Sequence, residues 1–303
     1  MLMEGGSKVG KIAGIDIGGT KIRFGIVNEL GEVLAEWTIP TKIPLYPYLE
    51  EQILRMKMDF PDLSGIGIGT RGMVDAETGV ITFEKELEGW QGTAVKSQLE
   101  TATGLRVECN NDANCAALAE VQLGAGKGFR RAACLTVGTG LGGGFIFDGR
   151  IMNGANGGAG EVGHMILYPN GLLCGCGRKG CSEQYVSGTA LRRLIREENV
   201  IDPETRDLAM PQHLFRLAVD GVASAISVRE RFLSDFAIVI SSLQAVLDME
   251  CVVIGGGVSD SADDWWDLLL ERVEPLKLKP FEMRRAVFGN EAGMLGAAML
   301  IVD

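Results

Sequence analysis

The chain has 303 residues, enough for two domains with one core each or for one large domain. Apolar residues make up 46% and charged residues 23%, which is ordinary for a globular protein and excludes a disordered chain. A formal charge of -11, from 29 basic and 40 acidic residues, repels nucleic acid and anionic membranes, so neither is expected as a main partner.

In chain order, the first ten residues, Met1–Gly10, lack the apolar core of a signal peptide and are expected to form a loose tail. No later apolar run reaches the length that spans a bilayer, so we expect a cytoplasmic protein. Apolar alternation then predicts three strands at 11–18, 21–28 and 32–39, the first two forming a hairpin around a glycine-rich turn. The pattern next predicts a helix at 46–59, a strand at 64–69, short strands at 79–84, a helix at 93–103, a strand ending near Cys109 and a helix at 113–123.

The second half opens in a similar way, with a strand at 132–137, a turn at 138–144 and a returning strand at 145–147. This echo of the first hairpin suggests two related halves. Further helices are expected at 187–198, 211–219, 222–248, 263–272 and 291–302, with a strand at 251–254. We therefore expect an N-terminal α/β domain over 1–123, joined by the C-terminal helix 291–303, and a larger α/β domain over 124–290.

Glycine is the outlier of the composition, at 42 residues, about twice its average share. Gly138-x-Gly140-x-x-Gly143 matches the dinucleotide fingerprint formally, but a strand follows it where that motif needs a helix, so we reject a Rossmann site. No Gly-x-x-x-x-Gly-Lys-Ser/Thr sequence is present, which excludes a P-loop.

Two strand–turn–strand units remain as candidate phosphate loops, at 16–21 and 136–140. Backbone N–H groups of such turns can converge on a phosphate, with Thr20 and Thr139 adding hydroxyls, Lys21 a positive charge and Asp16 an anchor for hydrated Mg²⁺. For either loop alone, an ordinary hairpin is the better explanation. Both loops together with a third glycine-rich strand end at 255–257 favour a nucleotide site, for which the candidate residues are Asp16, Gly18, Gly19, Thr20, Lys21, Gly138, Thr139, Gly140 and Gly256.

His164, Cys174, Cys176 and Cys181 offer one imidazole and three thiolates within 18 residues. That ligand set is typical of a closed, four-coordinate structural zinc site. Free cysteines in a loop are the alternative, and the close spacing disfavours it. The other four cysteines, which lie in apolar stretches, are expected to be buried: Cys109, Cys115, Cys134 and Cys251. His213 is expected to be a plain surface residue on a helix.

Several segments in this order resemble the ROK family of bacterial sugar kinases, and the resemblance covers nearly the whole chain. They are Asp16–Lys21, Asn111–Asn114, Gly138–Gly140, Gly160–His164 and Cys174–Glu183, of which the stretch Glu161–Glu183 is the most specific. The resemblance implies an actin-like, ribonuclease H-like fold of two α/β domains closing over ATP and a sugar, with a zinc loop at 164–181. It also implies a homodimer or a higher homo-oligomer.

The resemblance further implies that Asp112 is the general base and that Gly72, Asn111, Asp112, Glu161, His164 and Glu183 bind the sugar. From the residues alone, Asp112 would be explained as an N-cap of the following helix, although Asn111 could also serve as that cap. Glu161 and Glu183 could equally be solvated surface acids. Their position beside the metal loop favours sugar ligands, held in place by zinc.

The expected activity is ATP-dependent phosphorylation of a hexose 6-hydroxyl, with glucose favoured because 169–190 is most similar to the glucokinase branch. N-acetylmannosamine, N-acetylglucosamine and fructose kinases share the same motifs and remain alternatives. Arg71 departs from the family, whose members often have proline there, and this leaves the sugar preference open. A sugar-responsive ROK regulator is the rival from another class, and we disfavour it because Asp16 leaves no room for an N-terminal DNA-binding domain. A sugar-binding protein without catalysis is disfavoured because Asp16, Thr20 and Asp112 are all present.

Overall fold

The computed structural model describes residues 10–302, so the expected tail Met1–Gly10 lies, except for Gly10, outside the described residues. The contacts between residues divide the chain into two compact units. Unit 1 consists of Met1–Ala119, Ile151–Ala159 and Asn290–Asp303, and unit 2 of Glu120–Arg150 and Gly160–Gly289. In the described part of the chain, no helix is long and apolar enough to cross a membrane.

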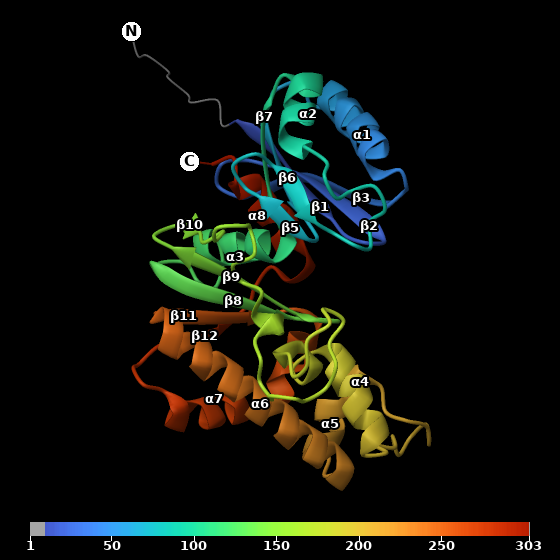
Figure 1. The fold of residues 1–303 in the computed structure, drawn as a ribbon, viewed down its shortest axis with the longest axis vertical. Coiled ribbons are helices and arrows are strands. Elements are labelled where there is room, and N and C mark those ends of the chain that lie inside the picture. Colours follow the sequence, from blue (N-terminus) through green and yellow to red (C-terminus); the bar gives the residue numbers. More distant parts are fainter. Residues whose placement is uncertain (1–9, 303) are drawn as a thin grey trace. The chain divides into compact units, whose positions relative to one another are not determined.

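The two large sheets have the same strand order (Figure 1). The first has the order β3-β2-β1-β4-β7, and the second has the order β10-β9-β8-β11-β12. In each sheet an antiparallel hairpin is extended by parallel strands, because β1 pairs antiparallel with β2 and parallel with β4, and β8 pairs antiparallel with β9 and parallel with β11. The first sheet comprises β1 Lys11–Ile17, β2 Lys21–Val27, β3 Val33–Pro40, β4 Leu63–Thr70 and β7 Arg106–Asn111. The second comprises β8 Arg131–Val137, β9 Leu141–Phe147, β10 Arg150–Ile151, β11 Cys251–Gly255 and β12 Glu282–Arg285.

The two faces of the first sheet are covered differently. On one face, alternate residues such as Ile15, Ile17 and Ile68 form a core with helix α1 (Leu45–Asp59) and helix α2 (Val95–Thr103). The opposite face of β4 carries glycine at every second position, and helix α8 (Ala292–Met299) packs there. A Cβ on Gly67 would overlap the carbonyl oxygen of Ala297. These glycines therefore let the helix backbone approach the strand backbone closely.

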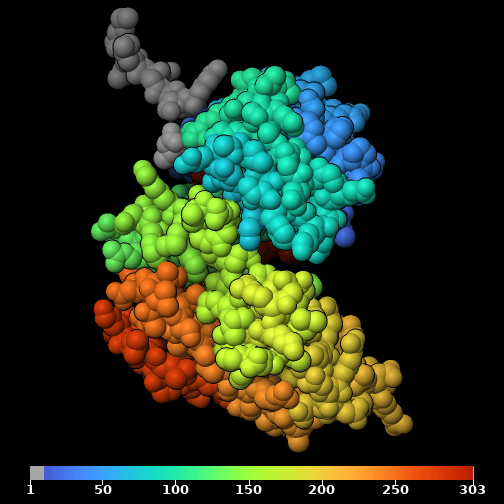
Figure 2. Space-filling view, in the orientation of Figure 1, coloured from blue at the N-terminus to red at the C-terminus, as the bar shows by residue number. Residues whose placement is uncertain are grey.

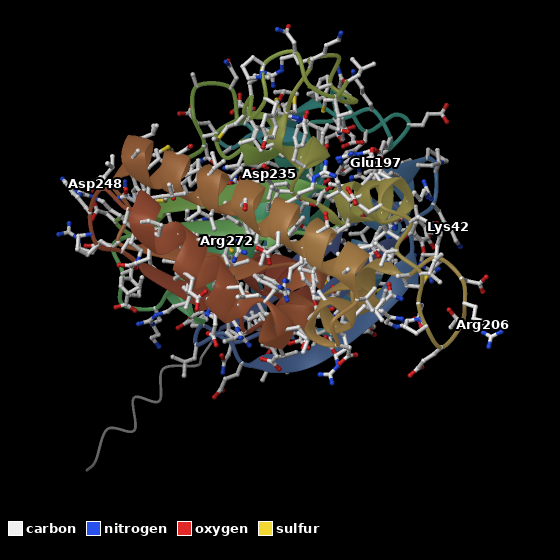
Figure 3. All side chains as sticks on the ribbon, turned by 90° about the horizontal axis from the view of Figure 1, so that it is seen from below. Lys42, Glu197, Arg206, Asp235, Asp248 and Arg272 are labelled. Carbon is white, nitrogen blue, oxygen red and sulfur yellow. The ribbon has the colours of Figure 1, made fainter. Side chains whose placement is uncertain are left out.

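Unit 2 places its helices beside the second sheet. The long helix α6 (Ala223–Leu247) contacts α4 (Gly188–Glu197), α5 (Leu214–Val219) and α7 (Trp266–Val273). Seen from below, α6 and α7 run side by side, with Asp235 on α6 and Arg272 on α7, and Arg272 pairs with Glu230 of α6 (Figure 3). Buried aromatic rings join these helices, and the centroids of Phe215 and Phe232 lie 5.8 Å apart.

The remaining helix lies where it was predicted, but of the two strands in the next hairpin only the second lies within the expected 79–84. Helix α3 (Asp112–Gln122) comes directly after β7, and β5 (Met73–Asp75) pairs with β6 (Val80–Phe83) in a separate hairpin of unit 1. Between β10 and α4 the chain has no long element, only the 3-10 turns η1 (Val162–His164) and η2 (Ser182–Gln184). The other 3-10 segments are η3 Pro211–His213, η4 Gly257–Asp264, η5 Glu274–Leu276 and η6 Gly289–Glu291.

Three sequence-based expectations about the elements are wrong. Gly142–Gly144 belong to β9 and not to a turn, since Gly143 makes room for Val162 against the strand. The helix expected at 211–219 is a 3-10 turn followed by the short α5, and the helix expected at 263–272 begins only at Trp266. Strand β12 was not anticipated, because its sequence, Glu-Met-Arg-Arg, shows no apolar alternation.

Candidate active site and metal-binding cluster

The carboxyl ends of three parallel strands meet at one edge of the first sheet. Ile17 of β1 pairs with Thr70 of β4, and Thr70 pairs with Asn111 of β7. The next residues along the chain are Gly18–Thr20 after β1, Arg71 after β4 and Asp112 after β7. This edge is where ligands of open α/β sheets generally bind.

The turn after β1 presents unpaired backbone donors. The Gly18 N–H donates to Lys21 O at 2.9 Å, which closes the turn. Within residues 10–302, the N–H groups of Gly19 and Thr20 have no acceptor, and both residues are exposed. The turn thus has the free N–H groups that a phosphate-binding loop requires.

Asn111, rather than Asp112, caps the helix that follows β7. The Asn111 Oδ1 accepts the N–H groups of Ala113, at 2.9 Å, and Asn114, at 3.2 Å, so Asn111 caps the helix. Its Nδ2 donates to Gly72 O at 3.0 Å, and Gly72 has a φ of 90° beside the carbonyl of Phe83, where a Cβ would not fit. Asp112 Oδ1 accepts only the adjacent Ala113 N–H, at 2.9 Å, among the described donors.

The carboxylates of this edge titrate abnormally. Burial raises the pKa of Asp112 from 3.8 to about 6, and the Asp16 carboxylate raises it further, while the Ala113 N–H and Arg71 oppose the shift. Burial likewise raises the pKa of Asp16 to about 6, against the opposing charges of Arg23 and Lys21. A carboxyl group with a pKa near 6 is ionised at neutral pH and is a stronger base than an ordinary aspartate.

The corresponding turn of unit 2 follows β8. Gly138 N–H donates to Gly140 O at 3.0 Å, and within the described residues the N–H groups of Thr139 and Gly140 have no acceptor. The start of α4 supports this turn, because Gly188 N–H donates to Gly138 O at 2.7 Å and Thr189 Oγ1 donates to Thr139 O at 2.7 Å. Gly256, with a φ of 88°, lies so close to Val137 of β8 that a Cβ would overlap its backbone.

A cavity of about 540 Å³ lies beside this turn, entirely within unit 2. It is lined by the predicted Gly138 and Thr139 and by residues that the sequence analysis missed, among them Leu191, Arg192, His213, Phe215 and Val258. His213 is exposed on η3, as expected, and its Nδ1 lies 3.6 Å from Asp202 Oδ2. The mixture of apolar walls with a few polar groups suits a nucleoside.

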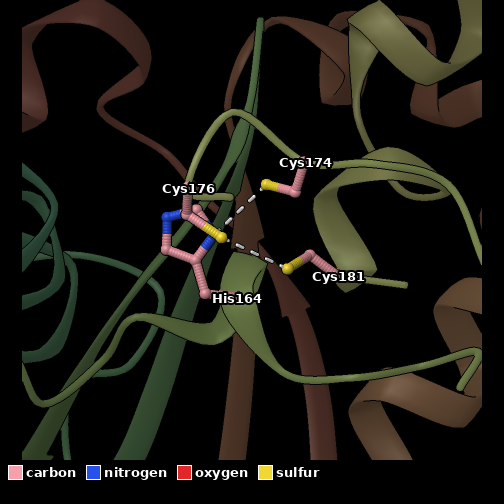
Figure 4. Close-up of side chains that lie close together, drawn as sticks. All are labelled: His164, Cys174, Cys176 and Cys181. Carbon is pink, nitrogen blue, oxygen red and sulfur yellow. Dashed lines mark hydrogen bonds between the residues drawn. The ribbon is translucent and has the colours of Figure 1, made fainter. Parts of the chain in front are cut away.

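The four residues of the predicted metal site come together in unit 2 (Figure 4). One nitrogen of His164 and the sulfurs of Cys174, Cys176 and Cys181 all lie within 4.8 Å of one another. The sulfurs of Cys176 and Cys181 are 3.6 Å apart, and Cys174 Sγ is 3.8 Å from His164 Nδ1. A tetrahedral zinc site with Zn–S bonds of 2.3 Å has ligand separations of about 3.7 Å, so the cluster fits zinc.

The thiols of the cluster differ in acidity. The backbone N–H of Arg178 lowers the pKa of the Cys176 thiol to about 6, which favours the thiolate that a metal binds, whereas burial raises the pKa of the Cys181 thiol to about 12. The loop is part of the surface of unit 2 in the space-filling view, where residues 160–185 are yellow-green (Figure 2). The other four cysteines are buried as expected: Cys109, Cys115, Cys134 and Cys251.

His164 connects the metal-binding cluster to the predicted sugar ligands. Its Nδ1 faces Cys174, while its Nε2 lies 3.8 Å from Glu161 Oε2. Glu183, two residues after Cys181, reaches the turn after β8, where its Oε2 accepts Leu141 N–H at 3.2 Å. A Cβ on Gly140 would overlap that same carboxylate oxygen, so a larger residue there would displace the carboxylate. Glu161, His164 and Glu183 are thus positioned by one short irregular segment.

Two α/β sheets of identical order and a His-Cys₃ cluster define a two-domain protein of the actin-like class. Residues 12–303 of the chain match the sequence model of the ROK family. A glucokinase of Thermotoga maritima is 33% identical over 313 residues, covering 97% of this chain and 98% of that protein. The N-acetyl-D-glucosamine kinase of Vibrio cholerae serotype O1 is 32% identical over 308 residues, covering 95% and 98%.

A crystal structure supports the same assignment. The ROK family glucokinase from Streptomyces griseus, in complex with glucose and AMPPNP, has a TM-score of 0.79 and 32% sequence identity, and the match covers 96% of this chain and 99% of that one. The chain belongs to the ROK family, and its prediction as a ROK family sugar kinase is confirmed.

Proposed function

We propose that the chain transfers the terminal phosphoryl group of ATP to the 6-hydroxyl of a hexose, with glucose the favoured acceptor. The observation that carries the proposal is Asp112, a partly buried carboxyl group with a pKa of about 6, at the same sheet edge as the free N–H groups of Gly19 and Thr20. Phosphoryl transfer needs a base within reach of the attacking hydroxyl and donors for the phosphoryl oxygens. Glucokinases over the full chain length are among the relatives.

In the proposed reaction, the Asp112 carboxylate accepts the proton of the sugar hydroxyl as its oxygen bonds to phosphorus. Asn111 and Gly72 would hold the sugar in unit 1, and in unit 2 Glu161 and Glu183 would accept hydrogen bonds from sugar hydroxyls while the Nε2–H of His164 would donate one. The N–H groups of Gly18–Thr20 and Gly138–Gly140 would bind phosphate oxygens, with Lys21 adding charge and Gly256 holding the strand end against Val137. The cavity beside Thr139 would take the nucleoside.

Two metal ions belong to the proposal. Asp16 would anchor hydrated Mg²⁺, which neutralises phosphate charge when bound. His164, Cys174, Cys176 and Cys181 would hold zinc, a closed four-ligand site that leaves no position for a reacting water. Because zinc would take Nδ1 of His164, the Nε2 would stay available to the sugar and to Glu161. We further expect a cytoplasmic homodimer or higher homo-oligomer, which light scattering tests.

The direct test measures ADP release with ATP·Mg²⁺ over glucose, mannose, fructose, N-acetylglucosamine and N-acetylmannosamine. We expect the highest kcat/KM with glucose. A clear preference for N-acetylglucosamine would move the assignment to the activity of the Vibrio cholerae relative. Absence of ADP release with every sugar would contradict the proposed function.

A further inference from the structure

Arg71 lies in the middle of the edge of the first sheet where the carboxyl ends of β1, β4 and β7 meet. It directly follows β4, the central strand of β1-β4-β7, whose neighbours end in the candidate phosphate turn and in Asp112. Position alone therefore places its backbone between the two groups that phosphoryl transfer requires. From the sequence, Arg71 could contact the substrate, a neighbouring carboxylate or solvent.

The side chain of Arg71 faces the same space. Its Nη1 lies 2.7 Å from Glu86 Oε2, and a Cβ built on Gly19 would lie 3.0 Å from that nitrogen. Glu86 is 66% exposed and Arg71 is 38% exposed, so solvent weakens their ion pair. Arginine carries five N–H donors in a planar fork, and one exposed carboxylate leaves most of them available for an anion.

Arg71 is the cation among several carboxylates, since Glu86, Glu84 and Asp112 all act on its guanidinium. Asp112 is faced by the Asp16 carboxylate from β1 and by Arg71 from the end of β4, with Cys115 on its own helix. Lys21 and Arg23 of β2 face Asp16 rather than Asp112. Glu84 also lies near Arg71, but its Oε1 is occupied by the N–H groups of Glu86 and Leu87. Among the described residues, Arg71 is the cation whose charge opposes the rise in the Asp112 pKa.

We propose that Arg71 is a catalytic residue, whose guanidinium leaves Glu86 and donates hydrogen bonds to the phosphoryl group that is transferred beside Asp112. This inference rests on the proposed function. In the step, the sugar oxygen bonds to the terminal phosphorus, the bond from that phosphorus to the bridging oxygen of ATP breaks, and ADP leaves with its electron pair. The hydroxyl proton goes to Asp112. Arg71 offsets the negative charge on the phosphoryl oxygens throughout.

A purely structural role is the alternative, in which the Arg71–Glu86 pair only ties the end of β4 to residues 84–90. Arg71→Gln and Glu86→Gln both remove that pair, so a tether predicts equal effects of the two variants. A catalytic Arg71 predicts unequal effects, because Glu86→Gln leaves the guanidinium in place. Arg71→Lys keeps the charge but loses the planar fork.

The experiment measures kcat, KM and their pH dependence for the wild type and these three variants, with the sugar that the wild type prefers. We expect Arg71→Gln to lower kcat by roughly 100-fold with little change in the KM of the sugar, and Arg71→Lys to fall between it and the wild type. Glu86→Gln should stay within about twofold of the wild type. The acidic limb of the kcat/KM profile should move to higher pH in Arg71→Gln alone, since Asp112 then loses its neighbouring cation.

A binding measurement adds a readout that does not depend on turnover. By calorimetry, AMPPNP should bind Arg71→Gln roughly 10-fold more weakly than it binds the wild type, while ADP, which lacks the terminal group, should bind both equally. The inference would be overturned if Arg71→Gln and Glu86→Gln lowered kcat equally and the acidic limb of the kcat/KM profile stayed in place. The Arg71–Glu86 pair would then be only a structural tether. If the wild type itself phosphorylated no sugar, the proposed function would fail first, whatever the variants did.

Discussion

The two units hold their acidic residues by different means, although their sheets share one strand order. In unit 1, Asp16 is paired within β1 and Asp112 directly follows β7 as the first residue of α3, and burial raises the pKa of each carboxyl group to about 6. In unit 2, Glu161 and Glu183 lie on an irregular segment with two 3-10 turns, beside the metal-binding cluster of His164, Cys174, Cys176 and Cys181. The sheet holds the carboxylates at its edge without further support, whereas an irregular loop needs a bound metal ion or a similar cross-link to hold its side chains in place.

Because of this difference, substitutions in the two units should impair the enzyme in different ways. Changes at Asp16 and Asp112 of unit 1 should act on the reaction itself, through the charge and protonation of Asp112. Changes in unit 2 should act on the position of the sugar, and so on its KM, and on the stability of the loop.

The largest effect is expected from Asp112→Asn. The amide has the size of the carboxyl group but accepts no proton, so kcat should fall by roughly 10²–10⁴-fold. The KM of the sugar should change little, because the amide can still bond a hydroxyl. Steady-state kinetics measure both constants, and substantial retained phosphorylation would sink the assignment of Asp112 as the base.

Removal of one ligand of the cluster comes next. Cys181→Ser should abolish stoichiometric zinc binding, measured by elemental analysis, and lower the free energy of unfolding by several kcal/mol, on the order of 3. Cys251→Ala, a change at a buried cysteine of β11 in the same unit, is the control. It should keep the metal and cost about 1–2 kcal/mol. Equal metal content in both variants would show that the cluster is not a zinc site.

Gly140→Ala tests how Glu183 is positioned. The added Cβ would overlap Glu183 Oε2, so the carboxylate must move and the KM of the sugar should rise by roughly 10-fold with a smaller effect on kcat. Gly175→Ala, where a Cβ meets no atom within 4 Å, is the matched control and should behave as the wild type. A normal KM in Gly140→Ala would remove Glu183 from the sugar site.

The smallest effect concerns the pH dependence of stability. The pKa of Asp112 is raised from 3.8 to about 6, so the folded state binds the proton more tightly than the unfolded state does. The resulting stabilisation is full below pH 3.8 and is lost as the pH rises through 6. Relative to the wild type, Asp112→Asn should therefore gain stability with rising pH, by about 2–3 kcal/mol between pH 4 and pH 7.5. Denaturant melts at pH 4 and pH 7.5 measure the gain, and its absence would mean an ordinary pKa.

Much of the fold could be predicted because its signals are local. Apolar alternation located the paired hairpins, and the spacing of one histidine and three cysteines located the cluster, since both patterns lie within short segments. The sequence also identified Asn111 and Asp112 as the two candidates for the N-cap of α3. In the structure the cap is Asn111.

The rest depends on contacts between distant segments. Gly67 was visible only as part of a glycine excess, because its partner, Ala297, is 230 residues further along the chain. His213 and Arg192 line the cavity beside Thr139 only after the helices of unit 2 have packed. Strand β12 is held by pairing with β11 and has no pattern of its own. The ion pair of Arg71 with Glu86 likewise joins segments on either side of a hairpin.

The measurement that tests the contrast between the units most directly is kinetics after zinc removal. A chelator is applied until elemental analysis finds no zinc, and kcat and the KM of the sugar are then compared with those of protein to which zinc has been returned. We predict a higher KM with a kcat within a few-fold of normal, restored when zinc is added. Unchanged kinetics in the metal-free protein would contradict the account, and so would a collapse of kcat at an unchanged KM.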